Sequence, residues 1–273
     1  MSGTASWTAR CAVIAMSVLF LTEAASAATT CTLIVDADTG ATLVRVGDRC
    51  DQRLTPASTF KIPLSLMGFD SGILHDANRP AWPYKEGYPA WIDLWKRTTT
   101  PQTWLRDSVV WYSQVLTGRL GADRFQRYVD GMHYGNGDVT GDAGRGNGLT
   151  AAWLSSSLRI SASEQVDFLR RMIHRQLPVS RSAIERTMAI MPVTSTGGWR
   201  VRGKPGTGLR QLADGSNDRD RHVGWFVGWA QRRGGRTLVF ARLVEDEHSE
   251  PTRAGLRARD SFLADWVALV VAP

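Results

Sequence analysis

The chain has 273 residues, of which 43% are hydrophobic and 22% charged, as in a globular protein and unlike a disordered or fibrous one. The net charge is +7 and the isoelectric point about 9.8, but the arginines are scattered and form no basic stripe with interleaved aromatics. We therefore expect no nucleic-acid partner and a mild preference for anionic ligands. The five histidines have no metal-ligand spacing, so we expect no metal.

The N-terminal sequence is typical of a secretory signal peptide. Arg10 precedes the apolar run 11–21, which is followed by the small-residue site Ala25-Ser26-Ala27. We predict cleavage after Ala27, which leaves residues 28–273 as the mature protein in the periplasm. The apolar run is too short to span a bilayer, and we expect no membrane anchor after processing.

The mature chain keeps two cysteines beside a predicted β-hairpin. Residues 31–36 and 42–46 flank a turn that contains Gly40, which predicts two antiparallel strands. Cys31 and Cys50 stand at the open end of this hairpin. Export to an oxidising compartment favours a disulfide between them, and two unrelated buried thiols are the alternative.

A serine and a lysine then stand three residues apart. Ser58 and Lys61 open an apolar helix predicted over 62–69, and residues three apart on a helix share a face. Serine is a weak nucleophile until a neighbouring base takes its proton, and a lysine without its charge can be that base. Alone, the Ser-x-x-Lys spacing is more typical of a chance pair on a solvated helix face than of a catalytic pair.

The middle of the chain is mainly helical. Residues 76–104, rich in Pro, Trp and Tyr, have no clear period and predict irregular structure with aromatic clusters. Further helices are expected at 102–118, at 121–132, from a capping box at Ser161 and Glu164 to before Pro178, and at about 180–190. A glycine-rich loop is expected between Gly135 and Gly148.

The last part of the chain is strand-rich. Strands are predicted at 198–204, 222–230 and 236–243, and a final helix carries Leu256, Leu263, Trp266, Val267 and Val270 at helical spacing. The predicted fold is thus α/β (α+β): an antiparallel sheet from about 28–57 and 191–273, flanked by helices, with a helical part inserted at about 58–190.

Four short motifs occur in a fixed order: Ser58-Thr59-Phe60-Lys61, Ser108-Val109-Val110, Tyr134-Gly135-Asn136 and Lys204-Pro205-Gly206. With this order and spacing, the mature chain resembles the class D (oxacillinase-type) serine β-lactamases over nearly its whole length. The resemblance implies the serine β-lactamase/penicillin-binding-protein fold, β-lactam antibiotics as substrates, and no cofactor. Oligomeric state and substrate range are not assigned.

The resemblance also implies roles for individual residues. Ser58 corresponds to the nucleophile, and Lys61 to a lysine that carbon dioxide converts to a carbamate (N6-carboxylysine), the general base. Burial would keep the amine uncharged so that it can react. Val110 and Trp153 match the carbamate pocket, where the Trp153 indole N–H is a donor; plain core packing is the alternative for Trp153.

Ser108 matches the serine that passes a proton to the departing lactam nitrogen, or is a helix serine satisfied locally. Lys204, Gly206 and Thr207 match the substrate-binding strand, with the Thr207 N–H as an oxyanion donor beside that of Ser58. The chain departs from this motif at Pro205, where the family has Thr or Ser; the lost hydroxyl and N–H predict weaker carboxylate binding or distortion. Tyr134-Gly135-Asn136 marks the site border or is simply a turn.

The substrate carboxylate is expected to bind Arg253, with Arg257 as the alternative. The function implied is hydrolysis of the β-lactam amide through a Ser58 acyl-enzyme, which gives antibiotic resistance. Two alternative functions of the same fold are a penicillin-binding sensor and a D,D-peptidase, either of which would be acylated without efficient turnover. A non-catalytic basic binding protein is a further alternative.

Overall fold

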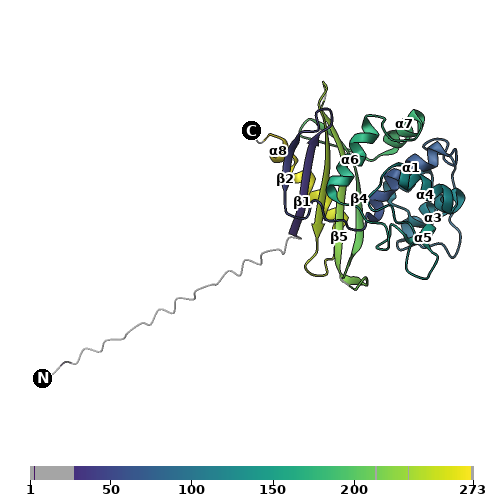
Figure 1. Ribbon diagram of the computed structural model, residues 1–273. Helices are drawn as coiled ribbons and strands as arrows, with labels where there is room; N and C mark the ends of the chain where they lie inside the picture. The colour runs from purple at the N-terminus through teal and green to yellow at the C-terminus, as the bar shows by residue number, and fades with distance from the viewer. Residues whose placement is uncertain (1–2, 4–27, 213, 233, 272–273) are drawn as a thin grey trace.

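The computed structural model describes residues 3, 28–212, 214–232 and 234–271; the predicted signal peptide and its cleavage site lie outside these residues, apart from Gly3. A six-stranded antiparallel sheet has the order β2-β1-β6-β5-β4-β3. Its strands are β1 (Ala28–Asp36), β2 (Thr42–Val46), β3 (Val193–Thr196), β4 (Trp199–Gln211), β5 (Asn217–Arg232) and β6 (Thr237–Glu245). Strands from both ends of the chain thus form one sheet (Figure 1), as predicted.

Side chains alternate between the two faces of each strand, so the buried residues form one cluster on each face of the sheet. On β5, Trp225, Val227 and Trp229 belong to the main core shared with the helical half of the chain. Phe226 and Ala230 point to the opposite face and pack with Phe262 and Trp266 of the C-terminal helix α8 (Ala254–Val271). In Figure 1, α8 and the helical half accordingly lie on opposite sides of the sheet.

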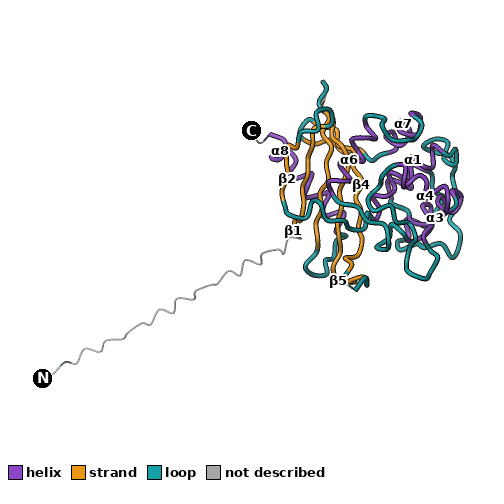
Figure 2. The backbone as a smooth tube through the Cα atoms, viewed as in Figure 1, coloured by secondary structure: helices purple, strands orange, loops and turns teal. Residues whose placement is uncertain are grey.

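The helical half follows β2 and precedes β3 (Figure 2). Its elements are η1 (Ala57–Phe60), α1 (Lys61–Asp70), η2 (Asp93–Trp95), α2 (Pro101–Asp107), α3 (Val110–Leu120), α4 (Ala122–Gly131), α5 (Gly148–Ala151), α6 (Ala162–Ile173) and α7 (Arg181–Ile190). α6 packs against β1 and β6 and so connects this half to the sheet. The predicted capping box begins α6: Glu164 N donates to Ser161 Oγ, and Ser161 N donates to Glu164.

The single helix predicted over 102–118 is wrong. Ser108, with φ 62° and ψ 33°, has a left-handed conformation that ends α2, and α3 begins two residues later. Periodicity does not reveal such a break because both flanking segments are apolar and helical. The three late strands are longer than predicted, and β3 was missed because its residues are mostly exposed and polar.

The disulfide Cys31–Cys50 is confirmed, with the two Cα atoms 5.1 Å apart. It joins β1 to the segment after β2 and closes the hairpin, which is also confirmed. We expect the double variant Cys31→Ser/Cys50→Ser to lose about 3 kcal/mol of unfolding free energy, because the unfolded chain gains loop entropy. Urea denaturation measures this loss; an unchanged midpoint would show that the crosslink does not stabilise the fold.

Within the described ranges, none of the helices combines the length and the apolar character needed to cross a membrane.

Candidate active site

Ser58 and Lys61 meet where η1 passes into α1. Lys61 Nζ lies 3.2 Å from Ser58 Oγ, and the lysine is fully buried. Burial, with a smaller contribution from the charge of Lys204, lowers the pKa of Lys61 well below its ordinary value. A neutral amine beside a hydroxyl is the arrangement that activates a serine nucleophile. The side-chain pair predicted from the Ser-x-x-Lys spacing is therefore present.

A second lysine–serine pair faces the first. Lys204 on β4 donates to Ser108 Oγ at 2.9 Å and to the carbonyl of Pro205 at 2.9 Å. Burial, and then Arg259, lower the pKa of Lys204 to about 7, against the opposing effect of Asp107. The left-handed turn at Ser108 presents this hydroxyl between α2 and α3, so the helix break positions a polar group at the site.

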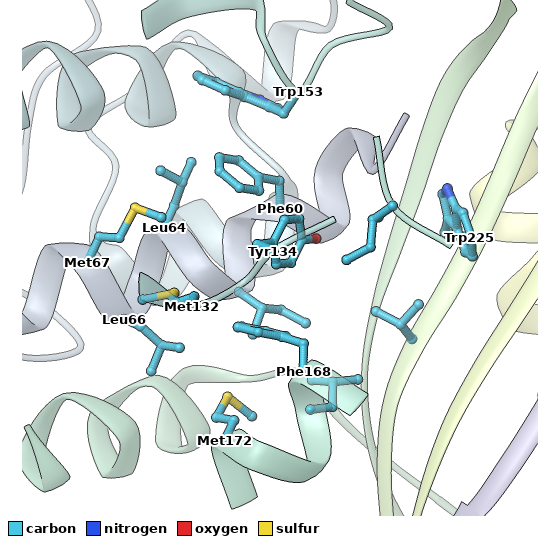
Figure 3. Close-up of a cluster of buried hydrophobic side chains, with 14 of the residues drawn as sticks. Phe60, Leu64, Leu66, Met67, Met132, Tyr134, Trp153, Phe168, Met172 and Trp225 are labelled. Carbon is cyan, nitrogen blue, oxygen red and sulfur yellow. The ribbon is translucent and has the colours of Figure 1, made fainter. Parts of the chain in front are cut away.

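Trp153 and Val110 lie in the apolar interior beside this pair, as Figure 3 illustrates for Trp153. The Trp153 ring stacks on Phe60 with centroids 5.6 Å apart and is fully buried. Its indole Nε1 is a buried donor with no hydrogen-bond partner among the described residues. A buried donor without a partner is costly, and an acceptor bound to Lys61 would satisfy it.

The β4 wall of the site is regular despite Pro205. Pairing between β4 and β5 continues through Pro205 opposite Phe226, and the register shifts only between Leu209 and Arg210. The distortion that we expected at Pro205 is therefore absent from this pairing. Beyond the end of β3, the other edge of β4 faces η1, which is where a proline is tolerated in a sheet.

The two candidate arginines differ in their surroundings. Arg253, just before α8, is exposed and lines the cavity above Ser58. Arg257, one turn later, forms an ion pair with the buried carboxylate of Asp246. Its Nε and Nη1 are buried and have no partner within the described part of the chain. The geometry leaves both arginines as candidates, with Arg253 at the cavity.

The cavity has a volume of about 520 Å³ and is largely apolar. It is lined by Ser58, Trp91, Trp95, Ser108, Leu154, Ser155, Pro205, Gly206, Thr207, Gly208, Leu209, His222, Arg253 and Leu256. Ser58, Ser108 and Arg253 thus share one pocket with aromatic walls. Such a pocket suits an organic anion with an apolar substituent.

Comparisons with known proteins identify the family. A family model described as the penicillin binding protein transpeptidase domain matches residues 30–268. The chain is 46% identical to β-lactamase OXA-9 of Klebsiella pneumoniae over 242 residues, 88% of each chain. It is 36% identical to β-lactamase OXA-1 of Escherichia coli over 235 residues, 85% of this chain and 82% of that one. The crystal structure of the OXA-427 class D β-lactamase is 46% identical with a TM-score of 0.82, covering 88% of this chain and 98% of that chain.

The chain belongs to the class D β-lactamases.

In this class D β-lactamase, the Tyr134-Gly135-Asn136 motif contacts the segment around Ser58 only through another residue. Tyr134 is buried and donates to Gln165 Oε1 at 3.4 Å; Gln165 Nε2 donates to Thr59 Oγ1 at 2.9 Å. Figure 3 shows Tyr134 just below Phe60, the residue that follows Thr59. The tyrosine therefore supports Thr59, the neighbour of Ser58, while Asn136 makes local turn contacts with Ser157 and Arg159.

Sequence reasoning missed Gln165, Ser155 and His222 in this class D β-lactamase. Ser155 accepts a hydrogen bond from Leu209 N at 2.8 Å and donates its own N–H to Thr55 Oγ1, so it connects three segments at the cavity. Its positive φ of 59° carries no sequence signal because serine is not typical of that conformation. His222 was assigned only to a strand, since a lone histidine without ligand spacing indicates nothing more.

Proposed function

We propose that this class D β-lactamase hydrolyses the β-lactam amide of penicillin-type antibiotics through an acyl-enzyme on Ser58, and so gives resistance to them. The observation that carries this proposal is the 3.2 Å contact between Ser58 Oγ and the buried Lys61 Nζ. A serine becomes an effective nucleophile when an adjacent base removes its proton. Lys61 is the lysine in hydrogen-bond contact with Ser58, whereas Lys204 contacts Ser108, so Lys61 is the base that we assign.

The residues around Lys61 fit carboxylation by carbon dioxide. Burial lowers the pKa of Lys61 well below its ordinary value, which favours the neutral amine, and the Trp153 indole offers a buried donor that lacks a partner among the described residues. Carbon dioxide, bound to the amine as a carbamate, supplies a carboxylate base for Ser58 and for the hydrolytic water. Trp153 and Val110 keep bulk water from this position, because both side chains are buried.

Ser108 and Lys204 supply the proton for the other side of the reaction. When Ser58 attacks the lactam carbonyl, the C–N bond breaks and the nitrogen must take up a proton. The Ser108 hydroxyl lies 2.9 Å from Lys204 Nζ, so Ser108 can give its proton and regain one from the ammonium. The pKa of Lys204, about 7, suits a group that both gives and accepts a proton near neutral pH.

The backbone N–H groups of Ser58 and Thr207 are proposed as the oxyanion hole. Thr59 packs directly against Gly206, where an added Cβ would lie 3.0 Å from Thr59 N, so η1 and β4 are closely apposed. Close apposition brings these two donors to one point. Removing one such donor typically costs about 3 kcal/mol of barrier, so their positions matter.

We further propose that the protein acts in the periplasm after removal of residues 1–27. The apolar run and the Ala25-Ser26-Ala27 site support this, and so does the Cys31–Cys50 disulfide, which suits an oxidising compartment. Its partners are the β-lactam antibiotics themselves.

The proposal is tested by mixing the purified mature protein with benzylpenicillin, with and without bicarbonate, and measuring turnover and intact mass. We expect turnover that rises with bicarbonate and a transient adduct on Ser58. Stoichiometric acylation without turnover would instead favour the sensor or D,D-peptidase alternative. Absence of both would contradict the proposed nucleophile.

The variant Trp153→Phe tests the carbamate pocket. It removes the buried N–H and keeps an aromatic ring, so we expect kcat to fall about tenfold in carbonate-free buffer, the effect of one hydrogen bond to a charged group. Added bicarbonate should restore most of the loss, as measured by a titration of kcat against bicarbonate. A loss that bicarbonate does not change would assign Trp153 to core packing alone.

A pair of variants distinguishes the two arginines. Because Arg253 lines the cavity, Arg253→Ala is expected to raise KM for benzylpenicillin by about 10- to 100-fold with a smaller effect on kcat. Arg257→Ala leaves Asp246 without its ion pair and should lower the melting temperature more. Steady-state kinetics and thermal unfolding of both variants measure this. The reverse pattern would make Arg257 the carboxylate anchor.

A further inference from the structure

The face of β4 that looks toward α8 lacks the hydroxyl that the family has next to Lys204. Pro205, Thr207 and Leu209 share this face because side chains alternate along a strand. The hydroxyl of Thr207 accepts a hydrogen bond from Gly255 N of α8 at 2.9 Å, so it is directed at the helix. A substrate carboxylate beside Pro205 therefore needs another donor from this part of the cavity.

His222 stands on the same face, on the neighbouring strand. It lies opposite Leu209 in the β4–β5 register, and directly opposite residues of an antiparallel pair share a face. Its side chain is 30% exposed and lines the cavity together with Arg253. Gly224 follows on that face opposite Thr207, where the first turn of α8 packs so closely that no Cβ fits.

A buried carboxylate lies behind this imidazole. Asp246, which follows β6, is 2% exposed, and its backbone N donates to the carbonyl of His222 at 2.9 Å. One carboxylate oxygen is paired with Arg257. The other, Oδ2, lies 3.8 Å from His222 Nδ1 and has no hydrogen-bond partner among the described residues. A buried carboxylate oxygen requires a donor, and the imidazole is the group poised to supply it.

We propose that His222 is a specificity-determining residue that binds the carboxylate of the β-lactam together with Arg253, and that Asp246 is its positioning residue. The inference rests on the proposed function. With Nδ1 directed at Asp246, Nε2 on the other side of the ring is the donor offered to the cavity. His222, opposite Leu209, thus offers a donor on the same face of the sheet as Pro205, where the hydroxyl is missing.

Charged groups surround His222 on every packed element. Asp246, which follows β6, faces His222 and forms an ion pair with Arg257 of α8. Arg253 lies just before α8 and lines the cavity. Arg210 of β4, next to Leu209, forms an ion pair with Glu245 of β6. On β5 itself, Arg221 forms an ion pair with Asp218. Of these charged groups, Arg253 shares the cavity lining with His222, and its positive charge favours an anion there.

The test compares benzylpenicillin with its methyl ester, which has no carboxylate. We expect His222→Ala to reduce kcat/KM for the acid about tenfold and to leave the ester within about twofold. The acid-to-ester ratio of kcat/KM should therefore be lower in His222→Ala than in the unmodified protein. The variant His75→Ala, at an exposed histidine outside the cavity lining, is the matched control and should match the unmodified protein.

Asp246→Asn tests the positioning role. Without the carboxylate that faces His222 Nδ1, the ring loses the group that orients it, so kcat/KM for the acid should fall and that for the ester should stay within about twofold, as in His222→Ala. Equal losses for acid and ester in His222→Ala would overturn the inference and leave the proposed hydrolysis intact. No turnover and no acylation of the unmodified protein by either compound would overturn both, which separates the two failures.

Discussion

Lys61→Ala is expected to lower kcat for penicillin hydrolysis by about 10³-fold, the typical value of a general base. The variant loses the buried amine 3.2 Å from Ser58 Oγ, so neither the serine nor the hydrolytic water has a base beside it. Any adduct that forms slowly should persist, which intact mass spectrometry after a penicillin pulse would record. Exposed Lys85→Ala is the matched control and should behave as the unmodified protein. A Lys61→Ala variant with rapid turnover would remove Lys61 from the mechanism.

The same lysine predicts a dependence on pH. Its pKa is held well below the ordinary value by burial, so the neutral amine persists to lower pH than in an ordinary lysine, and the amine becomes protonated as pH falls further. A protonated amine can neither take the serine proton nor react with carbon dioxide. We therefore expect activity to fall on the acid side, and bicarbonate to restore it less as the pH is lowered. Rate measurements across pH at two bicarbonate concentrations would check this.

The second large effect is expected from Ser58→Ala. It removes the only side-chain oxygen next to Lys61 Nζ within the described part of the molecule, and turnover should fall by about 10⁴-fold or more, as for serine nucleophiles in general. Intact mass should show no adduct at any time, in contrast to Lys61→Ala. Ser71→Ala, at the end of α1, keeps the helix and serves as control. Labelling of the Ser58→Ala variant by penicillin would show that another residue is acylated.

Local patterns predicted much of the fold. The hairpin 31–36 and 42–46, the apolar helix after Ser58 and the capping box at Ser161 depend on contacts between near neighbours in sequence, and the structure confirms them. The disulfide followed from the export signal and two cysteines. These features need no knowledge of distant segments, which is why the sequence suffices for them.

The missed features depend on distant contacts. Ser108 adopts a left-handed turn where Lys204, 96 residues later, donates to its hydroxyl, and no local signal marks that position. Gln165 reaches Thr59 across 106 residues, and it looks like any polar residue of an amphipathic helix. The distortion expected at Pro205 is absent for the same reason: a proline is tolerated there because β3 ends before it and leaves that edge of β4 unpaired.

Two glycines of β4 restrict how the cavity of this enzyme can change under antibiotic pressure. A Cβ at Gly206 would lie 3.0 Å from Thr59 N, and one at Gly208 2.5 Å from a methyl carbon of Thr55. A side chain at either glycine would therefore press on the segment that leads into or past Ser58. Trp91, which lines the cavity from the helical half, is 65% exposed and has more room for substitution. We expect changes in substrate range to arise more readily at Trp91 than at Gly206 or Gly208.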